Sequence, residues 1–210
     1  MHSLTGILLS SFVIALSGAV VPGPVLSVTV TESTRRGFMA GPMIILGHGV
    51  LEAALIIIIA LGFAEAIHNE RILGTVAIVG GVVLLWMAIN IVKDIKNIKT
   101  DLISDRGAWG GPIVAGALTS LANPYWIIWW MTIGLGYVMV SLTFGLVGLV
   151  VFFIGHISAD LLWYSIIAFL VSRGKRHLGK RLYGGILGVC ALMLLFFGIS
   201  FTVWGIGTLL

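Results

Sequence analysis

The sequence has 210 residues, of which 59% are hydrophobic and only 10% are charged, with a formal net charge of +4. A soluble domain carries about a quarter charged residues. This chain lacks the polar side chains to cover a water-facing surface, so we expect an integral protein of a lipid bilayer. The positive charge does not indicate a nucleic-acid partner, because the Lys and Arg residues lie in short segments between long apolar runs.

Six apolar stretches are each long enough to cross a hydrocarbon core of roughly 30 Å as a helix, which takes roughly 20 residues. None alternates with a period of two, as the strand of a membrane barrel does. The predicted fold is therefore all-α, a polytopic membrane protein of six transmembrane helices. In chain order the predicted spans are Leu4–Val30, Met39–Ala64, Leu73–Val92, Pro112–Val138, Leu142–Val171 and Tyr183–Trp204.

The first and fourth of these spans contain prolines that interrupt the helix. Proline removes a backbone N–H and clashes with the preceding turn, so Pro22-Gly23-Pro24 and Asn123-Pro124 are predicted breaks. Unsatisfied backbone groups cost several kcal/mol in hydrocarbon, so such breaks face protein or a water-filled cavity. The N-terminus of a half-helix attracts a carboxylate, and freed carbonyls attract an ammonium group. We therefore expect Pro22, Gly23, Pro24, Asn123 and Pro124 to bind substrate; kinks used only for packing are the alternative.

The second and fifth spans each carry a histidine followed by an acid four residues later. His48 precedes Glu52, and His156 precedes Asp160, so each pair shares one helical face. Ionisable groups within a membrane are costly and usually face the interior of the helix bundle, where they have a function. We expect these four residues to couple transport to protons or another ion. A purely structural pair that holds two helices together is the alternative.

The same four residues also allow a different interpretation. Imidazole suits borderline divalent metals and carboxylate suits harder ones, so His48, Glu52, His156 and Asp160 would make a plausible metal site. A divalent-metal-ion transporter is therefore the alternative function. The single cysteine, Cys190, excludes an internal disulfide and argues against soft ions.

The special residues recur in the two halves of the chain in the same order. We predict a first three-helix repeat over residues 1–92, a cytoplasmic linker over 93–109, and a second three-helix repeat over 110–210. Because three is an odd number, the second copy enters the membrane in the opposite direction. The result is one membrane domain built as two inverted repeats, a design in which transporters bind substrate between the repeats.

Basic residues indicate the orientation of the spans. All but Arg71 of the 12 Lys and Arg residues fall in three segments, which follow the first, third and fifth spans. Such residues mark the cytoplasmic side, so six spans predict a multi-pass protein of the cytoplasmic membrane with both termini outside. A re-entrant first segment would instead place the N-terminus in the cytoplasm. The residues are Arg35, Arg36, Lys93, Lys96, Lys99, Arg106, Arg173, Lys175, Arg176, Lys180 and Arg181.

Motifs for other kinds of chemistry are absent from the sequence. There is no GxxxxGK[ST], so we do not expect ATP to drive this chain. There is no GxSxG or HExxH either, and no loop is large enough for a soluble active site. We expect neither an enzyme nor a bound cofactor.

Two further patterns concern packing. Trp126, Trp129 and Trp130 could line a pocket, but aromatic residues at the membrane interface are the preferred interpretation. Gly184 and Gly188 have the GxxxG spacing that lets two helices approach closely, so we expect them to pack against another helix.

Taken together, these motifs resemble the lysine exporter / homoserine–threonine resistance (LysE/RhtB) family. The resemblance rests on Pro22-Gly23-Pro24, the glycines at 37, 41 and 47, and Leu121-Ala122-Asn123-Pro124 followed by Trp129-Trp130. It implies export of amino acids or close derivatives, or another small charged solute, driven by an ion or proton gradient, with proton antiport expected. The family commonly has a Lys where this chain has Tyr125, so we include Tyr125 among the expected substrate-binding residues. Whether the protein is a homodimer stays open.

Overall fold

The computed structural model describes residues 3–62, 70–98, 110–174 and 180–210, and every regular element among them is a helix. Five helical stretches are long and apolar enough to cross a membrane, and the bent pair α1–α2 would make a sixth. The prediction of an all-α polytopic membrane protein is confirmed. The elements are α1 (Leu4–Ala19), α2 (Pro24–Arg36), α3 (Ala40–Ala60), α5 (Glu70–Ile98), α6 (Pro112–Leu121), α7 (Pro124–Trp129), the π-helix η1 (Trp130–Gly134), α8 (Leu135–Leu142), α9 (Gly145–Gly174) and α10 (Lys180–Leu209).

Proline is the first residue of three of these helices. Pro24, Pro112 and Pro124 begin α2, α6 and α7, where a missing N–H does no harm because that group has no partner within the helix. α1 ends at Ala19, and the chain bends by 78° before α2 begins. α6 ends at Leu121, just before α7. The first and fourth apolar stretches therefore each contain the end of one helix and the beginning of the next.

α2 extends beyond the predicted end of the first span. It stops at Arg36 because the next residue, Gly37, has a φ of +80°, in the left-handed region that favours glycine. Arg35 and Arg36 therefore belong to the last helical turn and not to a loop. Their guanidinium groups lie 3.3 and 2.8 Å from the two carboxylate oxygens of Glu32, which is fully buried. Glu32 is a charged core residue that the sequence analysis missed.

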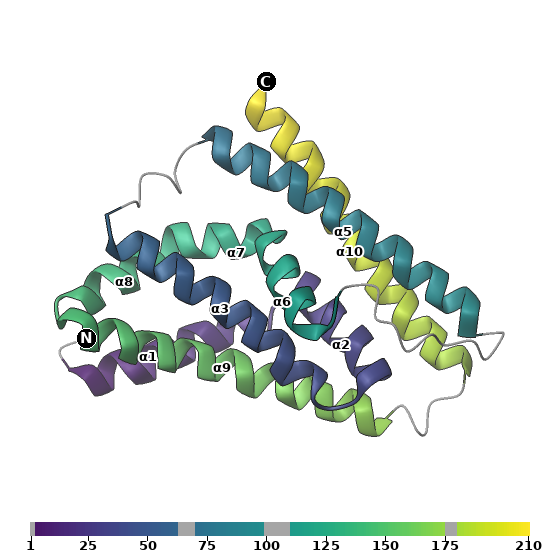
Figure 1. Cartoon of the computed structure of the whole chain (residues 1–210), viewed down its shortest axis with the longest axis horizontal. Coiled ribbons are helices and arrows are strands. Elements are labelled where there is room, and N and C mark those ends of the chain that lie inside the picture. Colours follow the sequence, from purple (N-terminus) through teal and green to yellow (C-terminus); the bar gives the residue numbers. More distant parts are fainter. Residues whose placement is uncertain (1–2, 63–69, 99–109, 175–179) are drawn as a thin grey trace.

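The interrupted helices pack against helices of the other half of the chain. α1 lies along α9, and α6 lies along α3. A Cβ atom at Gly155 of α9 would overlap the Leu8 carbonyl and the Ser11 hydroxyl of α1. A Cβ at Gly47 of α3 would likewise overlap the Ile113 carbonyl of α6. Glycine is therefore required at both contacts. α3 and α9 also lie beside each other (Figure 1).

α5 and α10 form an antiparallel pair at one side of the molecule (Figure 1). Glycines bring their backbones together, but Gly184 and Gly188 are not among them. A Cβ at Gly188 would meet nothing within 4 Å, so its predicted packing role is wrong for the part of the chain that the structure describes. The glycines in close contact are Gly74 with Gly205, and Gly81 with Gly198.

The candidate span Leu73–Lys93 agrees with the predicted third span, Leu73–Val92, but the helix that contains it is longer. α5 begins at Glu70 and runs to Ile98, so residues 93–98 continue this helix and do not begin the predicted linker. Residues 99–109, the rest of that linker, lie outside the described residues. Beyond its apolar run, the helix continues through polar residues. A helix can extend into the polar boundary of the membrane, where hydropathy no longer indicates its end.

Candidate functional site

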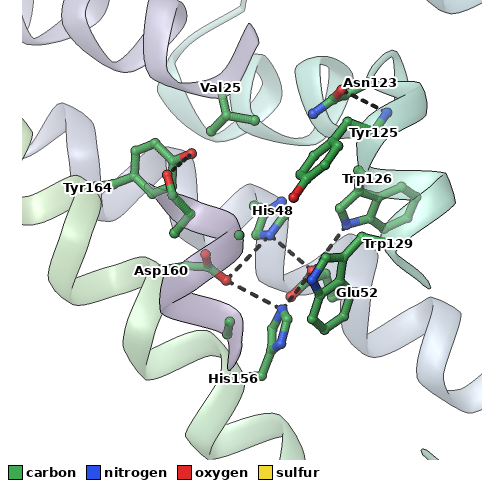
Figure 2. A pocket seen from close by; sticks show the side chains of 13 residues that line it. Val25, His48, Glu52, Asn123, Tyr125, Trp126, Trp129, His156, Asp160 and Tyr164 are labelled. Atoms are coloured by element: carbon green, nitrogen blue, oxygen red, sulfur yellow. Dashed lines mark hydrogen bonds and ion pairs between the residues drawn. The ribbon is translucent and has the colours of Figure 1, made fainter. Parts of the chain in front are cut away.

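Two histidines and two carboxylates meet at one point between α3 and α9 (Figure 2). His48 and Glu52 lie on α3, and His156 and Asp160 lie on α9. All four are buried, and one nitrogen or oxygen atom from each lies within 4.8 Å of the corresponding atoms of the others. The spacing of four within each pair places both members on the same face of their helix, as the sequence indicates.

Glu52 lies at the centre of this four-residue cluster. Its Oε1 atom is 3.1 Å from Nε2 of His48 and 3.1 Å from Nε2 of His156. Asp160 is slightly more distant, with its Oδ2 atom 3.7 Å from Nε2 of His48 and 3.5 Å from Nε2 of His156. Each imidazole therefore contacts both carboxylates, and each carboxylate contacts both imidazoles.

Two tryptophans hold Glu52 from the second half of the chain. The indole N–H groups of Trp126 and Trp130 donate to Glu52 Oε1 at 3.1 and 3.2 Å. Trp126 lies on α7 and Trp130 begins η1, a π-helical turn of the kind often found at functional sites. The interpretation of these residues as interfacial aromatics is wrong, because both indole N–H groups bond to a buried carboxylate. Trp129 lines a cavity beside the cluster.

His48 is oriented by its second ring nitrogen. Nδ1 lies 2.6 Å from the hydroxyl oxygen of Ser120, and that hydroxyl donates to the carbonyl of Gly116 at 2.8 Å. A serine hydroxyl has one hydrogen, so both contacts are satisfied when Nδ1 of His48 carries the ring N–H. In a neutral imidazole the bare Nε2 then faces two carboxylates. The sequence gives no signal for Ser120, which is one serine in an apolar helix.

A cavity of about 70 Å³ opens beside the cluster. All four ionisable side chains line it, together with Tyr125, whose hydroxyl points toward His48 (Figure 2). Tyr164 closes the opposite side, and its hydroxyl donates to the Ala19 carbonyl at the end of α1, at 3.5 Å. The cavity is therefore bordered both by the ionisable cluster and by the C-terminal end of α1.

A second cavity of about 100 Å³ adjoins the first and is bordered by both helix breaks. Pro22, Gly23 and Pro24 line it from the first break, and Asn123 and Tyr125 line it from the second. Pro124, which is also expected to bind substrate, begins α7 beside this break. Both cavities share the wall residues Gly18, Val25, Asn123, Tyr125 and Tyr164.

Asn123 caps the helix that begins at the second break. Its buried side chain accepts a hydrogen bond from the backbone N–H of Tyr125 at 3.1 Å. We expect Asn123→Ala to lower the free energy of unfolding by about 1 kcal/mol, because this N–H loses its partner. Thermal unfolding of the purified protein in detergent measures the effect. Asn123→Ser, which keeps a capping oxygen, is the control, and an unchanged melting temperature in the alanine variant would contradict the capping role.

The sequence was compared with known proteins. A family model described as LysE type translocator matches residues 16–205, a range that contains both helix breaks and all four ionisable residues. No curated protein and no solved structure matches the chain.

Proposed function

Because the chain belongs to the LysE type translocator family, we propose that it is a secondary active exporter of amino acids or close derivatives. Its family and its apolar helices make it a multi-pass membrane transporter. The observation that carries the more specific proposal is the position of the ionisable cluster. It borders a cavity, and the adjoining cavity has both helix breaks in its wall.

The helix breaks supply groups that suit the two charged ends of an amino acid. α2 begins beside the second cavity, and the backbone N–H of Val25 in its first turn has no partner within the helix. α7 also begins there, but its first N–H groups, those of Tyr125 and Trp126, already bond to Asn123. The positive end of α2, which has no side-chain cap, favours a carboxylate in this cavity. The carbonyl end of α1 and the two buried acids favour an ammonium group. We propose that Pro22, Gly23, Pro24, Asn123, Pro124 and Tyr125 form this substrate site.

The four-residue cluster is the proposed coupling site. Its two carboxylates are neutralised when both imidazoles are protonated, and removal of a proton leaves a buried net negative charge, which is costly. Each proton that leaves must therefore be replaced by another cation. The ammonium group of an amino acid in the adjacent cavity can supply that charge. Proton release and substrate binding are thereby linked, as antiport requires.

Alternating access requires two bodies that move against each other, and we propose two inverted repeats. Three features support this: α1 packs on α9 as α6 packs on α3, the third helices α5 and α10 pair, and each half contributes one His–acid pair to the cluster. The broken helices border both cavities, in keeping with a site between repeats. We propose the cytoplasmic membrane with both termini outside, since Lys and Arg mark the cytoplasmic side.

Efflux from proteoliposomes tests the proposed function. The standard amino acids are loaded one at a time, and a proton gradient is imposed across the membrane. We expect at least one amino acid to leave faster than from protein-free liposomes, and its exit to slow when an ionophore removes the gradient. Matched vesicles loaded with Mn²⁺ or Zn²⁺ test the alternative cargo. Metal efflux without any amino-acid efflux would overturn the proposal in favour of a metal transporter.

A further inference from the structure

We propose that His48, Glu52, His156 and Asp160 form a tetrahedral binding site for one divalent transition-metal ion of the zinc class. This metal occupies the coupling site and blocks export. The existence of the metal site follows from the cluster alone, whereas the block of export rests on the proposed function.

The spacing of the four ligand atoms fits a metal ion at their centre. Zinc binds imidazole nitrogen at about 2.0–2.1 Å and carboxylate oxygen at about 2.0–2.2 Å, so adjacent ligands of a tetrahedral site lie about 3.3–3.5 Å apart. The four nitrogen–oxygen distances in the cluster are 3.1, 3.1, 3.5 and 3.7 Å. All the ligand atoms lie within 4.8 Å of one another. Small side-chain movements would bring them to the distances that zinc requires.

Polar atoms in the cluster lack the partners that burial demands. Asp160 Oδ2 accepts no hydrogen bond from the described residues, although it faces both Nε2 atoms at 3.5 and 3.7 Å. Glu52 Oε2 is also buried without a hydrogen-bond partner among these residues. Buried carboxylate oxygens are costly unless a donor or a cation satisfies them. A metal at the centre satisfies Asp160 Oδ2, and a small rotation of Glu52 brings its second oxygen within reach.

The surroundings of the ligands resemble those of a metal site. A metal-bound histidine usually donates its other ring N–H to an oxygen, which fixes the tautomer and presents the bare nitrogen to the ion. His48 makes this contact through Nδ1 and Ser120. Glu52 is held by the indole N–H groups of Trp126 and Trp130, as ligating carboxylates commonly are. His48 and Glu52 are therefore oriented before any ion arrives, whereas Nδ1 of His156 has no hydrogen-bond partner among the described residues.

The charge of the cluster suits a divalent ion. With neutral imidazoles, the two carboxylates carry two negative charges, and one divalent ion cancels them. This balance matters because a net charge within the membrane is costly. The mixed nitrogen and oxygen ligands, with no thiolate among them, favour Zn²⁺ over soft monovalent ions.

Metal binding by the purified full-length protein tests the site directly. After chelator treatment and removal of the chelator, the protein is equilibrated with ZnCl₂ and bound zinc is measured by mass spectrometry. We expect about one zinc ion per chain. CoCl₂ serves as the visible probe, because tetrahedral Co²⁺ absorbs far more strongly than octahedral Co²⁺. A wild-type protein that binds no zinc, or gives only the weak octahedral spectrum, would overturn the proposal.

Variants locate the bound ion. His48→Gln combined with Asp160→Asn removes two ligands with little change in volume, and we expect the affinity for zinc to fall by about 100-fold or more. Glu70→Gln, which changes an exposed acid on α5, is the matched control and should bind as the wild type does. Size-exclusion chromatography without zinc shows that each variant is folded. If the double variant does not fold, zinc-dependent thermal stabilisation is compared between wild type and His156→Gln. Wild-type zinc affinity in either folded variant would contradict the assignment.

Export measurements separate this proposal from the proposed function. Zinc added to proteoliposomes is expected to stop amino-acid efflux, and a chelator is expected to restore it. Efflux that proceeds unchanged at a zinc concentration that saturates the site would overturn the proposed block of export. Amino-acid efflux by a protein that fails to bind zinc would contradict the metal site but not the proposed function. If the protein binds one zinc ion but exports no amino acid, the proposed function is contradicted and the metal site is not.

Discussion

Glu52→Gln is expected to slow gradient-driven export by about 100-fold or more, a loss of about 2.7 kcal/mol at 1.36 kcal/mol per tenfold. Glutamine keeps the size of the side chain but removes the negative charge that two imidazoles share at 3.1 Å. The remaining acid, Asp160, cannot neutralise two protonated histidines. The site then holds fewer protons, and their release no longer accompanies substrate binding. Efflux from proteoliposomes that contain equal amounts of protein measures the effect.

Two comparisons make this result specific. Glu70→Gln, which changes an exposed acid, should export at the wild-type rate. Asp160→Asn should also be impaired, but less severely, because its carboxylate lies farther from both imidazoles and receives no indole N–H. Export at the wild-type rate by the folded Glu52→Gln protein would show that this carboxylate does not couple export to the gradient.

The second large effect is expected from Gly155→Ala, which should lower the free energy of unfolding by about 3 kcal/mol and impair transport as well. A Cβ at this position would overlap the Ser11 hydroxyl and lie 2.5 Å from the Leu8 carbonyl oxygen, so α1 and α9 would have to separate. His156 is the next residue along α9 and would move with the backbone. For a chain of this length, the loss corresponds to a melting temperature lower by about 6–12 °C.

Gly188→Ala is the matched control for this substitution. A Cβ there meets nothing within 4 Å, and alanine is the better helix former by about 0.5–1 kcal/mol. We expect this variant to melt at the wild-type temperature or slightly above it. Thermal unfolding in detergent and efflux are measured on both proteins. A Gly155→Ala protein as stable as wild type would show that α1 and α9 do not approach as closely as described.

The all-helical membrane fold could be predicted from the sequence because hydrocarbon imposes a length on each span. The number of spans could be predicted only in part: the described residues contain five candidates, or six if α1 and α2 form one bent span. The ends of the helices could not be predicted. α2 continues through the polar residues Glu32, Arg35 and Arg36, which hydropathy assigns to a loop. Their charges are paired within the helix and Glu32 is fully buried, and hydropathy reports neither feature.

The candidate site was only partly visible in the sequence. A spacing of four places each histidine and acid on one helical face, and a membrane interior gives such groups few other places to go. The contact between α3 and α9, however, depends on tertiary packing. The roles of Trp126, Trp130 and Ser120 were hidden for the same reason. Their polar atoms reach the cluster from the second half of the chain, and no local pattern marks that contact.

The central claim is that export and proton movement are linked through the two buried carboxylates. The most direct measurement follows amino-acid efflux and the internal pH of the same proteoliposomes, which contain a trapped pH-sensitive dye. For the wild type we predict that protons move in the opposite direction to the amino acid whenever it is exported. In the Glu52→Gln, Asp160→Asn double variant, both movements should stop together. Amino-acid export with an unchanged proton movement in that variant would contradict the account.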